Sequence, residues 1–148
     1  MMERDETLRL ARRYAAAYEA LTPGTIPALT DLAAANVRFS DPFNEFRGRD
    51  RLAAVFRHMF DGLTAPAFAV TDVAVGEAGN ENVAYLRWRF TFLYRQRPHT
   101  IDGVSEVHFD GDGLVSVHLD HWDSATQVYM HVPILGRLIA AIRRRLAG

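Results

Sequence analysis

Apolar residues in the first part of the chain recur at intervals of three and four, which is the spacing of one face of a helix. Leu10, Tyr14 and Tyr18 share such a face, and the helix that carries them is interrupted by Pro23 and Gly24. The spacing predicts three helices, over residues 5–21, 26–34 and 49–60.

The second part of the chain alternates with a period of two, which is typical of strands. Trp88 and Phe90 lie on one face of a long alternating segment, and Arg87 and Arg89 lie on the other. Two glycines in the stretch 110–113 favour a hairpin turn, since glycine accepts positive φ. Strands are predicted over residues 37–41, 68–75 and 84–94, from the turn at 95–98 to Phe109, and over 114–122. Helices first and long antiparallel strands afterwards predict an α+β fold with the helices on one side of the sheet.

Composition fits a single domain over residues 1–148, because 49% of the residues are hydrophobic and 24% are charged. The net charge of −1 argues against a nucleic-acid surface, which needs clustered basic charge. No apolar run approaches the ~20 residues that span a bilayer, and the charged N-terminus lacks the apolar core of a signal peptide. Cysteine is absent, which excludes disulfides and a cysteine nucleophile. We therefore expect a cytoplasmic protein.

Residues 124–148 form a predicted C-terminal helical extension, for which Asp123 or Ser124 can provide the first cap. An apolar stripe runs along it beside arginines at positions 137, 143, 144 and 145. Such a helix can touch an anionic membrane surface. We expect instead that it packs on the domain, with the arginines favoured by the C-terminal end of the helix dipole.

Asp41 is a candidate general base, because it ends a strand between Phe39 and Phe43. If it shares the inward side with Phe39, desolvation would raise the pKa of its carboxyl and suit it to proton abstraction near neutral pH. The alternative is an ordinary turn-forming aspartate before Pro42. Tyr14 is likewise either a hydrogen-bond donor into a pocket or a plain core tyrosine.

His118, Asp120 and Trp122 alternate along the last strand and therefore share a face. Pointing inward, the His and Asp could serve as a base or as an orienting pair. Pointing outward, they are a solvent face, and the apolar residues Val115, Val117 and Leu119 on the other side favour that second interpretation. The six histidines show no zinc-type spacing, so no metal site is expected. No P-loop, dinucleotide fingerprint or G-x-S-x-G motif is present either.

Taken together, these motifs resemble the nuclear transport factor 2-like superfamily, and specifically its ketosteroid isomerase and SnoaL-like polyketide cyclase branch. The resemblance covers about residues 8 to 123 and rests on four features: Arg13-Tyr14 with the Val37–Pro42 strand end and Gly48, the aromatic strand ending at Tyr94, the 110–113 hairpin, and the closing segment 118–123. It implies a cone-like, strongly bent antiparallel sheet that encloses a ligand pocket, and a homodimer. The resemblance also implies an inward face for the last strand and a substrate pocket lined by Tyr18, Phe39, Phe43, Phe56, Met59, Phe60, Trp88, Phe90 and Trp122.

Residue by residue, the resemblance places the isomerase's general base on Asp41 and its oxyanion-binding tyrosine on Tyr14. The second oxyanion donor falls on Ser105, where a hydroxyl replaces a carboxylic acid and is the weaker donor. In the cyclase branch an acid on the last strand is the base, which matches Asp120 with His118 beside it. Both acids remain candidates, and two carboxylates in one pocket would push one pKa upward.

We therefore expect cofactor-independent proton transfer, an isomerisation or a cyclisation, on a hydrophobic carbonyl compound. An epoxide hydrolase with this fold would use Asp and Arg on neighbouring strands, but Arg89 lies on the outward face by periodicity. The alternative is a non-catalytic module that binds a hydrophobic ligand or another protein. A purely apolar cavity, with Asp41 paired to Arg38 or Arg47, would favour that alternative.

Overall fold

The computed structural model describes residues 2–147, and only the backbone of Met130. The predicted domain limits, residues 1 and 148, lie outside the described residues. The helices are α1 (Arg4–Glu19), η1 (Pro23–Thr25), α2 (Ile26–Thr30), α3 (Arg49–Gly62), α4 (Ser124–Gln127), η2 (Tyr129–His131) and α5 (Pro133–Leu146). The strands are β1 (Ala33–Ser40), β2 (Glu45–Arg47), β3 (Thr64–Val75), β4 (Val83–Tyr94), β5 (Arg97–Phe109) and β6 (Val115–His121).

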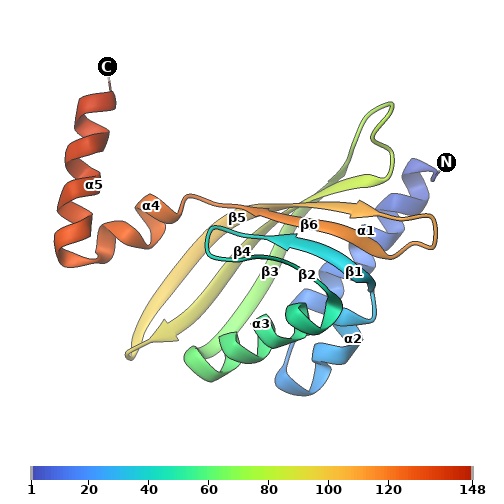
Figure 1. Cartoon of the computed structure of the whole chain (residues 1–148), viewed down its shortest axis with the longest axis horizontal. Helices are drawn as coiled ribbons and strands as arrows, with labels where there is room; N and C mark the ends of the chain where they lie inside the picture. The colour runs from blue at the N-terminus through green and yellow to red at the C-terminus, as the bar shows by residue number, and fades with distance from the viewer. Residues whose placement is uncertain (1, 148) are drawn as a thin grey trace.

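All six strands form one curled, unclosed sheet in the order β2-β1-β6-β5-β4-β3. The α+β class and the bent sheet are confirmed, and Figure 1 shows the long strands β3, β4 and β5 curving away from the helices at one end. The sheet is not purely antiparallel as predicted, because β1 and β6 run parallel. They become neighbours through the long crossover that contains β3, β4 and β5, which local patterns do not reveal.

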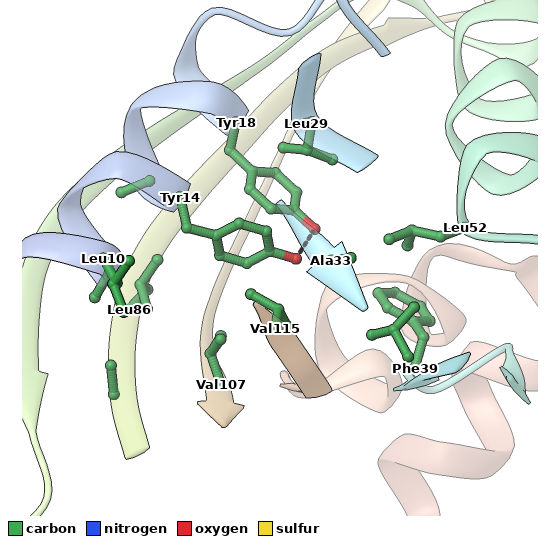
Figure 2. Packing of buried hydrophobic residues seen from close by; sticks show 14 of the residues in the cluster. Leu10, Tyr14, Tyr18, Leu29, Ala33, Phe39, Leu52, Leu86, Val107 and Val115 are labelled. Carbon is green, nitrogen blue, oxygen red and sulfur yellow. Dashed lines mark hydrogen bonds between the residues drawn. The ribbon is translucent and has the colours of Figure 1, made fainter. Parts of the chain in front are cut away.

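Helices α1 and α3 pack on the concave side of the sheet, where the core lies. Figure 2 shows Leu10, Tyr14 and Tyr18 of α1 directed towards Leu86 of β4 and Val107 of β5. Each of these side chains is at least nine-tenths buried. The helical spacing predicted for residues 5–21 is therefore the face that covers the sheet.

The second predicted helix is shorter than expected, because α2 ends at Thr30 and Ala33 already belongs to β1. Alanine favours helices, but here Ala33 pairs with Val115 of β6, and the Val115 N–H donates to the Leu32 carbonyl at 2.9 Å. Pairing with a distant strand outweighs the local helix propensity of this segment.

The alternation predicted for the long strand β4 is confirmed. Leu86 and Trp88 are buried, whereas Tyr85 and Arg89 lie exposed on the outer face. Arg89 forms an ion pair there with Asp102 of β5, with Nε 2.8 Å from Oδ1. Arg89 therefore lies on the outer face, as periodicity predicts, and not beside the inward acids where an epoxide hydrolase would need it.

A bulge in β6 decides which face of this strand points inward. Phe109 pairs with Val115 and His108 pairs with Val117, so one step along β5 corresponds to two steps along β6. The extra residue, Ser116, changes the alternation, so that Val115 and His118 are both buried. The assignment of Val115 to the face opposite His118 was therefore wrong, and the inward face implied by the resemblance is correct.

The predicted helical extension consists of three helices, α4, η2 and α5, of which α5 begins at Pro133. The Asp123 side chain caps α4 by accepting from the Thr126 N–H at 3.1 Å. Helix α5 packs mainly on η2 and projects away from the sheet, as Figure 1 shows. All of its large apolar side chains except the half-buried Ile139 are exposed, so the expectation that this stripe packs on the domain was wrong. Across residues 2–147, no helix combines the length and apolarity needed to cross a membrane.

Candidate active site

A cavity of about 1040 Å³ opens between the concave face of the sheet, α3 and the segment after β6. That volume suits a ligand of drug-like or small polycyclic size. Eight of the nine predicted pocket residues line it: Tyr18, Phe39, Phe43, Phe56, Met59, Trp88, Phe90 and Trp122. Phe60 does not line it, and its partly buried side chain packs against the core cluster.

Asp120 lies at the centre of the polar groups within this cavity. Its Oδ1 accepts from the Ser105 hydroxyl at 2.5 Å and lies 2.7 Å from Nε2 of His118. The Ser105 Oγ in turn accepts from the Trp88 indole N–H at 2.8 Å. Both bonds to Asp120 use Oδ1, and Oδ2 makes no hydrogen bond to a described residue.

His118 connects this carboxylate to two buried tyrosines. Its Nδ1 lies 2.8 Å from the Tyr14 hydroxyl, and that hydroxyl lies 3.3 Å from the Tyr18 hydroxyl. Figure 2 shows the contact between the two tyrosines. The His118 ring also faces Phe39 of the neighbouring strand β1, with ring centroids 5.0 Å apart. Packing and hydrogen bonds on both ring nitrogens therefore fix the imidazole in one orientation.

With Asp120 ionised and His118 neutral, each bond in the network acquires a direction. A carboxylate only accepts, so Ser105 O–H and His118 Nε2–H both donate to it. The Nδ1 of His118 then accepts from Tyr14, and the Tyr14 oxygen accepts from Tyr18. Two chains of donors, one from Trp88 and one from Tyr18, thus end on the same carboxylate oxygen.

Both tyrosines stay protonated at any ordinary pH. Burial raises the pKa of Tyr14, the hydrogen bond with Tyr18 opposes that rise, and the nearby charge of Asp120 adds to it. Burial also raises the pKa of Tyr18 well above its usual value, and the charges of Tyr14 and Asp120 act in the same direction. The two phenols are therefore hydrogen-bond donors rather than bases.

The structure separates the two tyrosines by position. Tyr18 lines the cavity, whereas Tyr14 lies behind His118, is almost completely buried and does not line the cavity. Of the candidates Asp41, Asp120 and Tyr14, only the two acids therefore line this cavity. Tyr14 reaches the site through the imidazole.

Asp41 also lines the cavity, but its carboxylate accepts the hydrogen bonds of a local turn. Its Oδ1 accepts from the N–H groups of Phe43 and Asn44, both at 2.7 Å, and the Asn44 side-chain amide lies 3.1 Å from each carboxylate oxygen. These contacts are those of the turn-forming aspartate that the sequence offered as the alternative to a general base. No pairing with Arg38 is present, because Arg38 faces Glu45 at 3.4 Å.

Ser105 has a different role from the one that the resemblance implies. It lies opposite Asp120 in the β5–β6 ladder and is buried between Asp120 and Trp88. Because its proton is directed to Asp120, the hydroxyl acts on the carboxylate rather than on a substrate oxygen. Gly103, which pairs with Trp88 across the β4–β5 ladder, leaves the space in which the indole lies.

Sequence reasoning missed several residues that line the cavity, of which Phe68 is the clearest. Its ring stacks on Phe90 at 4.4 Å and meets the Tyr18 ring at 5.3 Å. Phe68 sits on β3, whose alternation is weak, but the register that pairs it with Phe90 places both on the inward face. The alternation of β4 is clear from the sequence, and pairing β3 with β4 would have placed Phe68 on the same inward face as Phe90. The further lining residues are Asn44, Val55, His58, Gly62, Leu63, Val70, Leu86, Phe92, Tyr94, Arg95, Arg97, His99, Ile101, Gln127, Val128, His131 and Val132.

Polar side chains other than the Asp120 network are spread along the cavity rather than gathered. His99 stacks on Phe92 with centroids 5.3 Å apart, and Gln127 ties α4 to β5 through two hydrogen bonds with the Asp102 backbone. Among the described residues, no group of three or more His, Asp or Glu side chains is arranged to hold a metal ion.

A curled, unclosed sheet covered by helices around a largely apolar cavity is the architecture of small cone-shaped α+β domains. This chain belongs to the SnoaL-like domain family, whose family model matches residues 12–118. The match ends at His118, so Asp120 lies just beyond it. No curated protein sequence is significantly similar to the chain.

Two solved structures are similar in fold. An NTF2-like (nuclear transport factor 2-like) protein of unknown function from Exiguobacterium sp. 255-15 superposes with a TM-score of 0.67 at 18% identity, covering 77% of this chain and 98% of its own. A protein from Pseudomonas putida KT2440 described as a "putative polyketide cyclase" superposes with a TM-score of 0.65 at 16% identity, covering 83% of this chain and 93% of its own. At these identities the similarity establishes the fold alone, so any activity has to be argued from the residues of the site.

Proposed function

We propose that this protein catalyses cofactor-independent proton transfer on a hydrophobic carbonyl compound, in an isomerisation or a cyclisation. The observation that carries the proposal is the Asp120 carboxylate inside the apolar cavity, with two hydrogen-bond donors on Oδ1 and no such partner on Oδ2. That arrangement leaves one oxygen of an oriented base facing the space that a ligand fills.

In the proposed step, Asp120 Oδ2 takes a proton from the carbon next to the substrate's carbonyl group. The electron pair of the broken C–H bond moves to the carbonyl oxygen and forms an enolate. Tyr18, which lines the cavity, supplies an O–H donor for that oxygen, in keeping with its protonated state. When a C=C bond is conjugated with the enolate, return of the proton from Asp120 to the far carbon of that bond completes an isomerisation. When the enolate carbon attacks a second carbonyl group, the C=O electron pair moves to the oxygen, which takes the proton from Asp120 and completes a cyclisation.

His118 and Ser105 act as positioning residues in this mechanism. Their bonds to Oδ1 fix the carboxylate, and Tyr14 fixes the imidazole from behind through Nδ1. A base must lie within hydrogen-bond reach of the proton it removes, so this orientation matters as much as basicity. Asp41 is not assigned the base because its Oδ1 serves the turn.

The proposal is tested by exchange of carbon-bound hydrogen in D2O, followed by NMR on β-tetralone, a bicyclic ketone small enough for the cavity. The wild type should accelerate loss of the signals of the hydrogens next to the carbonyl. Asp120→Asn should slow that exchange at least about 100-fold, the lower range for a general base. The matched control is Asp102→Asn on the outer face of the sheet, which should exchange at the wild-type rate.

The second candidate is a non-catalytic module for a hydrophobic ligand, and one observation favours it. The side chains of Asp41 and Ser105 make their hydrogen bonds within the protein, and most of the cavity lining is apolar. Saturable binding of β-tetralone without any exchange above buffer would support this alternative and remove the proton-transfer proposal. The homodimer implied by the resemblance stays a prediction of either account.

A further inference from the structure

Helix α5 presents its large apolar side chains to solvent. Ile134 is 85% exposed, Leu138 is 56% exposed and Ile142 is 49% exposed. These residues recur at intervals of four, so they form one stripe along the helix. An exposed stripe of this kind marks a surface that another molecule covers.

The contact of α5 with its own chain uses a different face. Gly136 is its buried residue, and Ile139 and Ala140, one turn further along, are half-buried. This face of α5 therefore packs towards η2, while the stripe of Ile134, Leu138 and Ile142 faces away from the protein. This orientation leaves the stripe available without any movement of the helix.

Charge along the chain is strongly segregated around this helix. Residues 124–148 contain four arginines and no Asp or Glu, whereas all 18 acidic residues precede them. Arg143 is close enough to Asp123 to lower the pKa of that carboxyl, and Arg137, Arg144 and Arg145 are exposed. The segment that carries the stripe is therefore also positively charged.

We propose that α5 is an interfacial helix that binds the surface of an anionic lipid bilayer. An apolar stripe beside arginines, without acidic residues, matches the chemistry of a membrane of negatively charged lipids, because the stripe enters the acyl boundary while the cations meet the headgroups. The 14-residue helix is about 21 Å long, which suits lying in the plane of the interface rather than crossing the bilayer.

The position of α5 gives this contact a consequence for the cavity. Val132, which precedes the helix directly, lines the cavity, as do Val128 and His131. A bilayer bound by α5 therefore lies at the same end of the molecule as these lining residues. This placement favours a substrate that partitions into lipid, an inference that rests on the proposed function.

The test is flotation of the whole chain with vesicles of phosphatidylcholine alone or with phosphatidylglycerol added. The wild type should float with the anionic vesicles, and binding should weaken as salt is raised. Replacing Arg137, Arg144 and Arg145 with Gln should lower the partition coefficient about 100-fold, since three charges near the surface are lost. Replacing Leu138 and Ile142 with Gln should lower it more than about 10-fold through loss of buried apolar area.

The matched control removes three exposed arginines from other helices, Arg12, Arg51 and Arg57, and should float like the wild type. The proposal is overturned if anionic vesicles do not bind the chain, or if the α5 variants float as well as the control. It is also overturned if the Leu138 and Ile142 changes abolish self-association in sedimentation velocity without affecting flotation, because a second copy then covers the stripe. Flotation does not depend on β-tetralone exchange, so the two proposals can fail separately.

Discussion

Substituting Gly103 with Ala should disturb the donor chain that reaches Asp120 from Trp88. A Cβ atom at position 103 would lie 2.5 Å from Cζ2 and 2.6 Å from Cη2 of the Trp88 indole, and 3.0 Å from the carbonyl oxygen of His121. The first two distances are about 1 Å shorter than an ordinary carbon–carbon contact. The indole is a rigid ring and must move as a whole.

The expected cost follows from these distances. Inserting a methyl group into a packed site costs about 1–3 kcal/mol of unfolding free energy. A shift of the ring by about 1 Å also lengthens the 2.8 Å bond from the Trp88 N–H to the Ser105 hydroxyl beyond hydrogen-bond range. Loss of that buried bond adds about 1 kcal/mol, so we expect a total loss of about 2–4 kcal/mol.

Urea unfolding measures this cost, with Gly111→Ala as the control. Gly111 has no atom within 4 Å of the added methyl group and a backbone that alanine can adopt, so its substitution should be close to neutral. In a Trp88→Phe background the clashing ring atoms are gone, so Gly103→Ala should cost at least about 1 kcal/mol less there than in the wild type. Equal costs for Gly103→Ala in the two backgrounds, or a cost matching that of Gly111→Ala, would refute the packing argument.

Three further predictions concern the other end of the donor network and the turn. Tyr14→Phe removes the hydroxyl 2.8 Å from His118 Nδ1 and should lower the unfolding free energy in urea by about 1–3 kcal/mol; an unchanged midpoint would contradict the bond. Asp41→Ala should cost about 1 kcal/mol because the turn loses its acceptor, whereas Asp41→Asn should cost less because it keeps one; equal costs would show that the turn is not what the side chain stabilises. Burial raises the pKa of Tyr14 and Tyr18, so their contribution is complete below the unfolded-state pKa of about 10 and is lost as pH rises above it. Stability measured from about pH 9 to about pH 11 should therefore fall more steeply in the wild type than in the Tyr14→Phe, Tyr18→Phe double variant, and parallel curves would contradict this.

Much of the fold could be predicted because local patterns and long-range packing agree in it. The three-to-four spacing of Leu10 and Tyr14 and the period of two around Trp88 each correspond to a face that is buried in the structure. Prediction failed where a distant partner decides the local conformation. Ala33 and Ala34 form a strand because β6 lies beside them, and the short strand β2 has too few residues to show a period.

The candidate site was harder to predict than the fold, since it depends on the bulge in β6. Strict alternation places Val115, Val117 and Leu119 on one face and His118 on the other, whereas the structure buries Val115 and His118 and leaves Val117 and Leu119 half-buried. The extra residue Ser116 causes this difference, and no local sequence pattern predicts its insertion. The resemblance supplied the correct direction because it refers to a whole fold rather than to one strand.

The outcome for α5 illustrates a different limit. An amphipathic pattern indicates that one face will be covered, but it does not say by what. The structure shows that the chain's own domain does not cover Leu138 and Ile142. The sequence pattern therefore predicted the apolar stripe correctly, but the expectation that the chain's own domain covers it was wrong.

The central claim is that the Nε2–H of His118 donates a hydrogen bond to the ionised Asp120 carboxylate and so holds it as an oriented base. Nitrogen-15 NMR of the His118 ring at mildly alkaline pH measures this directly, because the two ring nitrogens differ in chemical shift when only one carries hydrogen. We expect the hydrogen on Nε2, facing Asp120, with Nδ1 unprotonated and facing Tyr14. A hydrogen on Nδ1 alone would reverse the direction of the network and would contradict the account.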